Sequence, residues 1–344
     1  MDRRKFLKGI SLGLLSLSGC SRVGRATAAG ETAAGVPPGE PRDTFAKPQA
    51  SGKPRVVLVT SQDWKGSPEE SSLRRGLAAG MEALAGASAA DAWRQFFRPD
   101  ENIAVKVNCI AGPSLSSSPA LVRALVGELT AAGHPPARIW IYDRTSAELE
   151  EAGFELSRDS GGIKCLGTDE VGYDREVTVT GDVGTWFSLI ISQWADAIVN
   201  VPIAKDHDLS GISGALKNHF GSISNPNKLH YPDLSAAIAD VAAAAPIAGK
   251  QRLVVYDLLR VCYDGGPAYK PATTKAYGAI LLSTDPVAAD TVVVSILDEL
   301  RAGEGLPSLW KRESNPSHLS IAADATHSLG CADRSKIYVE RVKV

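Results

Sequence analysis

Buried strands and amphipathic helices alternate along the amino-terminal half of the chain, and this alternation constrains the fold more than any other feature. Apolar, β-branched runs predict strands at residues 55–60, 102–107 and 138–142. The spacing of apolar residues between them predicts helices at 69–84 and 119–130. Strands that alternate with helices form parallel sheets with right-handed crossovers. We therefore predict an α/β fold, with a mainly parallel sheet flanked by helices.

The rest of the chain continues this pattern with one interruption. Short β-like pieces broken by glycines occupy residues 161–191 and predict a small β-rich insertion or an edge of the sheet. Beyond them we expect strands at 197–201, 252–258 and 278–283, helices at 233–244, 286–300 and 317–328, and a final edge strand at 336–344. Together these elements predict one α/β domain, with or without an inserted subdomain, over residues 55–344.

The amino terminus carries an export signal and is not expected to belong to the fold. Arg3 and Arg4 lie in a twin-arginine pattern, and the apolar run at 10–17 is too short to cross a bilayer as a helix. The run LSGC that ends at Cys20 resembles a lipobox, in which the cysteine is acylated and becomes the first mature residue. We expect residues 1–20 to be read by the twin-arginine export machinery, and the mature protein to be a lipoprotein anchored in the periplasm or cell envelope.

The segment after Cys20 leaves the mode of release open. An ATA run at 26–28 offers an ordinary small-residue cleavage site, and cleavage there would yield a free soluble protein instead of a lipoprotein. Residues 21–54 are rich in Ala, Gly, Pro and Thr and show no hydrophobic period. We therefore expect a flexible tether between the anchor and the domain.

Charge and cysteine spacing exclude several classes of partner and cofactor. The chain has a formal net charge of −2, and residues 1–19 hold four basic side chains against one acidic. The mature chain is therefore more acidic still, which argues against non-specific nucleic-acid binding. Cys109, Cys165, Cys262 and Cys331 lie more than fifty residues apart. This spacing argues against iron–sulfur clusters and structural zinc, whereas one or two disulfides of open pairing fit an oxidising compartment. No residue pattern identifies a cofactor.

A segment rich in side-chain donors, residues 195–231, predicts a ligand site. The apolar run at 197–201 is stopped by Pro202, so the following residues leave a strand at its carboxyl end, where open α/β sheets bind their ligands. The polar side chains that follow include Lys205, His207, Lys217, Asn218, His219, Lys228 and His230, with glycines between them. Such a density of donors is costly to bury in a core, so we interpret the segment as a site.

A second group of polar residues follows another predicted strand. Lys106 and Asn108 end that strand, and a serine-rich loop leads from them to Ser118 at a helix amino terminus. Such a junction attracts anions, although Ser118 as a simple N-cap beside a solvated loop is the alternative. Parallel strands end at one edge of the sheet, so Lys106 and Asn108 should face Lys205 and His207. Those two side chains, two residues apart in extended chain, should point the same way.

These groups together predict a basic pocket for a small anionic ligand, such as a phosphate, a carboxylate or an acidic cofactor. His207 is the candidate acid/base, with Lys205 and Lys217 stabilising negative charge. We expect Asp290 to face inward and to pair with a lysine of this group. The candidate ligand-binding residues are Lys106, Asn108, Ser118, Asn218, Lys228, His230 and Asp290.

Two alternatives stay open. The same pocket could serve a non-catalytic lipoprotein that binds a solute or cofactor. A metal site could instead be built from His207, His219 and His230, although spacings of twelve and eleven residues match no compact metal motif. A hydrogen-bonded structural role is the alternative for each of these histidines, and for His207, beside Lys205, we favour the functional role. We place His318 and His327 on the surface of the last predicted helix.

The motifs that carry these residues resemble those of a bacterial and archaeal family catalogued as domain of unknown function 362. Its pattern reads approximately Lys-x-Asn, Lys-Thr-His, Leu-Lys-Asn-x-Phe-Gly and Asp-Pro-x-Ala-x-Asp. The matching residues here are Lys106, Asn108, Lys205, His207, Leu216, Lys217, Asn218, Phe220, Gly221, Asp285, Pro286, Ala288 and Asp290, while Asp206 replaces the usual threonine. The resemblance covers nearly all of residues 55–344 and implies common ancestry but no agreed activity. Many relatives contain cysteine-rich ferredoxin-like modules, which this chain lacks, so the resemblance does not extend to electron transfer.

Overall fold

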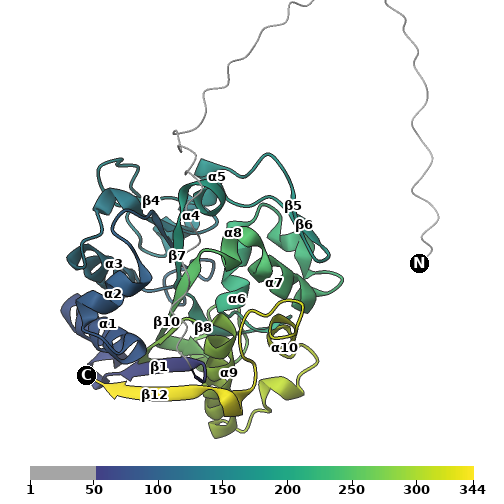
Figure 1. Cartoon of the computed structure of the whole chain (residues 1–344). Coiled ribbons are helices and arrows are strands. Elements are labelled where there is room, and N and C mark those ends of the chain that lie inside the picture. The colour runs from purple at the N-terminus through teal and green to yellow at the C-terminus, as the bar shows by residue number, and fades with distance from the viewer. Residues whose placement is uncertain (1–51) are drawn as a thin grey trace, which may run out of the picture. The chain divides into compact units, whose positions relative to one another are not determined.

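Strands and helices alternate through residues 52–344, the part of the chain that the computed structural model describes (Figure 1). The predicted signal peptide, with Arg3, Arg4 and Cys20, lies outside the described residues, as does nearly all of the predicted tether. Within residues 52–344, no helix is long and apolar enough to cross a membrane.

A mixed, mostly parallel sheet carries the fold. Its strands are β1 (Arg55–Thr60), β2 (Ile103–Lys106), β3 (Ile139–Tyr142), β4 (Lys164–Cys165), β7 (Ala197–Asn200), β8 (Ile203–His207), β9 (Gly211–Ile212), β10 (Gln251–Cys262), β11 (Thr274–Ser283) and β12 (Tyr338–Lys343). The order is β12-β1-β11-β10-β7-β2-β3-β4, with β8 paired to β10 and β9 paired to β8. Within this sheet, β11 pairs with β1 and β10 in antiparallel fashion, and β9 pairs with β8 in the same way, whereas the other pairs are parallel. The predicted α/β fold with a mainly parallel sheet is therefore confirmed.

Helices cover both faces of this sheet. They are α1 (Glu70–Ala85), α2 (Ala89–Phe96), α3 (Pro119–Ala131), α4 (Ser146–Glu151), α5 (Thr168–Val171), α6 (Ala215–Asn218), α7 (Leu234–Ala243), α8 (Ala245–Ala248), α9 (Pro286–Gly303) and α10 (His318–Ala322). Figure 1 shows α1, α2 and α3 together on one side, with α7, α9 and α10 on the other.

The strands bury side chains on both faces, which explains their continuous apolar runs. In β1, Val57 and Val59 pack with α1, α2 and α3, whereas Val56 and Leu58 pack with α7, α9 and α10. The same alternation holds along β2, where Ile103 packs in the core formed with α1, α2 and α3. Because a one-residue slip would exchange the two sets, the packing of both faces specifies the strand register.

The β-rich insertion is smaller than its sequence suggests. β5 (Thr178–Thr180) and β6 (Val183–Thr185) form a separate two-stranded antiparallel sheet. The apolar run near residue 190, which we expected to be β-like, instead enters a π-helix over Ile190–Trp194. Phe187, Ile190 and Trp194 all enter one core. Their helical spacing therefore outweighs the β propensity of the run.

The last predicted helix is also shorter than expected. It ends at Ala322, because the Asp324 carboxylate accepts the backbone amides of Thr326 and His327, each at 2.9 Å, and turns the chain. His318, which we placed on the surface, is fully buried. The ring of His327 lies between Asp324, at 2.9 Å, and Asp240, at 3.0 Å.

Three parallel strands end together at one edge of the sheet. Lys106, the last residue of β2, lies opposite Tyr142 of β3 and Asn200 of β7. Past Pro202, the chain continues as β8 beside β10. The polar segments that follow these strands therefore meet at the carboxyl edge, as the parallel arrangement predicts.

No disulfide joins the cysteines of residues 52–344. Cys109, Cys165, Cys262 and Cys331 are all free thiols, so the disulfides that we considered from the sequence are not formed. Burial raises the pKa of Cys165 to about 12 and that of Cys109 above its usual range, which makes both thiols unreactive.

Candidate functional site

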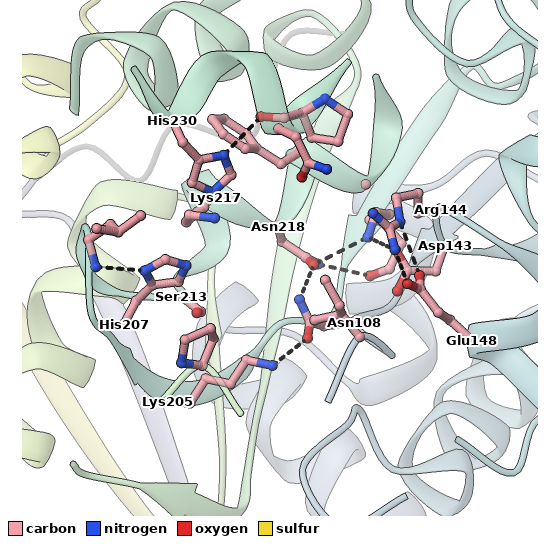
Figure 2. A pocket seen from close by; sticks show the side chains of 18 of the residues that line it. Asn108, Asp143, Arg144, Glu148, Lys205, His207, Ser213, Lys217, Asn218 and His230 are labelled. Atoms are coloured by element: carbon pink, nitrogen blue, oxygen red, sulfur yellow. Dashed lines mark hydrogen bonds and ion pairs between the residues drawn. The ribbon is translucent and has the colours of Figure 1, made fainter. Parts of the chain in front are cut away.

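A cavity of about 320 Å³ lies at the carboxyl edge of the sheet (Figure 2). Segments distant in sequence contribute to it, among them the chain after β2, the chain after β3, β8, α6, the 3₁₀ helix Pro226–His230 and the chain after β10. Its volume falls at the lower end of the roughly 300–1,000 Å³ that small-molecule sites occupy.

Most of the residues expected at a pocket line this cavity. The predicted residues present there are Lys106, Asn108, Lys205, His207, Lys217, Asn218 and His230. Sequence reasoning missed Asp143, Arg144, Glu148, Asp208 and Ser213, which line the same cavity. Asp143 and Arg144 follow β3 directly, so the rule applied to the ends of the other strands would have identified them.

Lys106 is fully hydrogen-bonded within the protein. Its ammonium donates to Asp143 Oδ1 at 2.6 Å, to Asn218 Oδ1 at 3.2 Å and to the backbone oxygen of Val107. An ammonium has three N–H groups, so none remains for a ligand. The second oxygen of Asp143 accepts the amide of Cys109 at 2.6 Å. Lys106, which we expected to bind ligand, therefore serves as part of the wall.

A chain of amides links a second lysine to this pair. Lys205 donates to Asn108 Oδ1 at 2.9 Å, and Asn108 Nδ2 donates to Asn218 Oδ1 at 3.1 Å. Asn218 Nδ2 donates in turn to Asn200 Oδ1 at 2.7 Å. Because Lys106 and Lys205 are donors only, they determine which way the amides of Asn108 and Asn218 point. Figure 2 shows the part of this chain from Lys205 through Asn108 to Asn218.

Lys205 and Lys217 have no carboxylate partner among the described residues, in contrast to the other two cations of the cavity. Lys106 pairs with Asp143, and Arg144 pairs with Glu148. The ammonium of Lys217 lies 4.8 Å from the centre of the Phe220 ring. Burial lowers the pKa of Lys205 and of Lys217 to about 8 each, since charge is poorly solvated there.

His207 and His230 are neutral and present complementary ring atoms to the cavity. His207 Nδ1 accepts the amide of Leu209 at 3.1 Å, so its proton lies on Nε2. Asp208 lies 3.1 Å from the same Nδ1, but burial and then the Lys217 charge lower the pKa of His207 to about 2, which keeps the ring neutral. His230 Nδ1 lies 3.1 Å from the backbone oxygen of Pro226 and must donate to it, which leaves Nε2 as an acceptor.

Ser118 lies outside this cavity, and its helix terminus already holds an anion. The backbone amide of Ser118 donates to Asp257 Oδ2 at 2.7 Å. Asp257 lies within β10 and is buried, which raises the pKa of its carboxyl to about 6. The chain thus supplies its own carboxylate at the junction that we expected to bind a ligand.

Asp290 and Lys228 also lie away from the cavity. Asp290 is buried and accepts the amides of Ala215 and Leu216 at 2.6 and 3.1 Å. The predicted pairing of Asp290 with a lysine is therefore wrong. The Asp290 carboxylate instead caps α6, the four-residue helix that carries Lys217. Lys228 is exposed and lines a neighbouring depression instead.

The three histidines considered for a metal do not converge. His219 Nε2 lies 2.6 Å from Gln251 Oε1 and 3.3 Å from Asn200 Nδ2, behind the wall of the cavity. His207 and His230 remain together, with ring centres 6.3 Å apart. Across residues 52–344 there is no group of three or more His, Cys, Asp or Glu side chains that could hold a metal ion.

We predict that Gly221→Ala will disturb the Lys106–Asp143 pair. A Cβ at this position would lie 2.5 Å from Asp143 Oδ1 and 2.7 Å from Lys106 Nζ. Overpacking of this kind destabilises by about 1–3 kcal/mol, measured as the free energy of unfolding in urea. Gly303→Ala is the matched control, because a Cβ added there would meet no atom within 4 Å. Equal stability of the two variants would contradict the prediction.

The part of the chain that matches a known family includes the cavity. The sequence matches the family model described as Domain of unknown function (DUF362) over residues 103–295, which is more than half of the chain. Every residue that lines the cavity falls within this span. Among curated proteins, no sequence matches the chain. The chain belongs to the family described as Domain of unknown function (DUF362).

Proposed function

We propose that this protein binds a small anionic organic molecule in the cavity and acts on it as an enzyme, with His207 as acid/base. One observation carries the proposal, namely that Lys205 and Lys217 face the cavity without a carboxylate partner among the described residues. A buried cation without a counter-charge is unfavourable, so an anion in the cavity would be stabilised by both.

The charge of the lining supports a ligand with a single negative charge. Both histidines are neutral. The charged side chains are the basic Lys106, Arg144, Lys205 and Lys217 and the acidic Asp143, Glu148 and Asp208, which leaves an excess of one positive charge. Two backbone amides that begin α6 are occupied by Asp290, so side chains would hold the ligand. This arrangement suits a monocarboxylate better than a phosphate, which usually binds at free backbone amides.

His207 is suited to exchange a proton with such a ligand. Its Nε2–H has no hydrogen-bond partner among the described residues and lines the cavity. An anion bound beside the ring would offset the Lys217 charge and raise the pKa of His207, which brings the ring closer to the range useful for proton transfer. A protein that only captures its ligand would need the lysines but not this histidine.

We predict that the full chain binds at least one of acetate, pyruvate and lactate, measured by isothermal titration calorimetry. Lys205→Ala and Lys217→Ala should each weaken binding by roughly ten- to a hundredfold, since a charge-assisted hydrogen bond contributes about 1.5–3 kcal/mol. His207→Gln should change the binding affinity by less than about tenfold and should abolish any turnover.

Lys164→Ala is the matched control for these variants. Lys164 also has a pKa lowered by burial, but it lies over the Trp140 and Trp194 rings, outside the cavity. Affinity for the anion should not change in this variant. The proposal fails if none of the three anions binds, or if Lys164→Ala weakens binding as much as Lys205→Ala.

We predict that anion affinity falls as the pH rises from 7 to 10. The pKa values of Lys205 and Lys217 are lowered to about 8, so both lose their charge over this range, while a carboxylate stays ionised. The loss should be roughly tenfold per pH unit above the pKa for one titrating lysine and steeper for two. The double variant Lys205→Arg with Lys217→Arg should flatten the profile, because arginine stays charged. A flat profile in the unmodified protein would count against lysine-mediated binding.

The export address is a further part of the proposal. We propose that the twin-arginine machinery exports the protein to the periplasm or cell envelope and that Cys20 carries a lipid. The twin-arginine pattern and the LSGC run support this, and both lie outside the described residues. An anchor on Cys20 followed by some thirty residues of tether would let the domain stand clear of the membrane surface.

We predict that Arg3→Lys with Arg4→Lys will leave uncleaved precursor in the cytoplasm, measured by cell fractionation and immunoblotting. Cys20→Ala should remove the lipid and release any exported protein from the membrane fraction. Arg22→Lys with Arg25→Lys is the matched control, because these arginines follow the predicted cleavage site. Export of the first variant at the level of this control would refute the twin-arginine assignment.

A further inference from the structure

Lys217 differs from the other basic side chains of the cavity, because no hydrogen bond holds its amine. Lys106 has three acceptors, Arg144 pairs with Glu148, and Lys205 donates to Asn108. Within residues 52–344, the Lys217 amine has no hydrogen bond or ion pair, and the face of Phe220 is its nearest aromatic contact.

The surroundings of Lys217 favour a reactive, neutral amine. Burial is the main cause that lowers its pKa to about 8. Lys217 is therefore uncharged in roughly a tenth of the molecules near pH 7, whereas an ordinary lysine is uncharged in less than a thousandth of them. A neutral amine in a desolvated pocket is the form that attacks carbonyl groups.

Two neutral imidazoles stand beside this amine with opposite hydrogen-bonding roles. His207 presents Nε2–H as a donor and His230 presents Nε2 as an acceptor, because Leu209 and Pro226 determine their tautomers. The Lys217 charge is the second-largest cause of the lowered pKa of both rings, after burial, which places the amine close to each. Figure 2 shows the end of Lys217 between these two rings.

We propose that Lys217 forms an imine with an oxo acid, whose carboxylate is held by Lys205. This inference rests on the proposed function and names its ligand class. The neutral Nζ attacks the carbonyl carbon, and the resulting carbinolamine loses its oxygen as water. His230 Nε2 accepts each of the two protons that the nitrogen loses and passes it to the oxygen, first as the alkoxide and then as the leaving hydroxyl, while His207 Nε2–H donates a hydrogen bond to that oxygen. Amine and carbonyl become imine and water, and nothing is oxidised or reduced.

Lys205 is the less suitable amine for this reaction. Asn108 Oδ1 accepts a hydrogen bond from its ammonium at 2.9 Å, which orients it and favours its charged form. The two lysines line the same cavity, and the Lys217 charge contributes to the lowered pKa of Lys205. One ammonium can therefore hold a carboxylate while the other amine reaches a carbonyl of the same molecule.

The test is reductive trapping with pyruvate. The purified full chain is incubated with pyruvate and sodium cyanoborohydride, and the product is analysed by intact mass and peptide mapping. We expect one stable adduct per chain, on Lys217. Lactate, which lacks the carbonyl group, should compete with pyruvate and slow the trapping without forming an adduct.

Three variants separate a specific site from general lysine reactivity. Lys217→Arg keeps the positive charge and should abolish the adduct, with circular dichroism as the check on folding. His207→Phe removes this hydrogen-bond donor and should slow trapping by at least about tenfold, since loss of one donor to a developing oxyanion costs about a hundredfold or more. Lys164→Arg removes a different lysine of lowered pKa and should leave the adduct unchanged.

Two results would overturn the imine and have different consequences. If pyruvate and lactate bind in a Lys205-dependent way but no adduct forms, or if Lys164 reacts as fast as Lys217, the imine is refuted while the anion site stands. If neither binds and no adduct forms, the imine and the proposed monocarboxylate site fail together.

Discussion

The buried ion pair between Lys106 and Asp143 organises the carboxyl edge of the sheet. Lys106 ends β2 and Asp143 follows β3, so their 2.6 Å contact joins the two strand ends. A buried pair repays the loss of hydration only when its remaining hydrogen bonds are made. Asn218, the Val107 carbonyl and the Cys109 amide make them here. The pair thereby ties α6 and the chain after β2 to the strands and forms one wall of the cavity.

The architecture was largely predictable from the sequence, because strand and helix periods are local properties. The placement of Lys205 and His207 on one side followed from extended geometry, and β8 confirms it. The errors came from non-local partners. Asp257 lies in the middle of an apolar strand, and nothing in its neighbours indicates that it caps the helix at Ser118. Likewise, Asp290 serves α6, a four-residue helix too short to have a periodic pattern of its own.

Charge in the cavity depends on which carboxylates pair with its basic side chains, which is why residue type alone misjudged it. Four basic side chains line the cavity, but two of them are neutralised by carboxylates that sequence reasoning did not assign to the site. The histidines follow the same logic. Burial and the Lys217 charge keep His207 and His230 neutral, so they act as hydrogen-bonding groups and not as additional cations.

The side-chain amides beneath the cavity determine whether the charge of Lys205 is available to a ligand. Lys205 is held by Asn108, Asn108 by Asn218, and Asn218 by Asn200, whose own amide donates to Gln251 at 2.8 Å. An amide oxygen orients an ammonium without cancelling its charge, whereas a carboxylate does both. A ligand that enters would therefore meet a lysine already in position and still attractive to an anion, and little binding energy would be lost in rearranging it. Positioning by amides thus accounts for a basic site within an acidic protein.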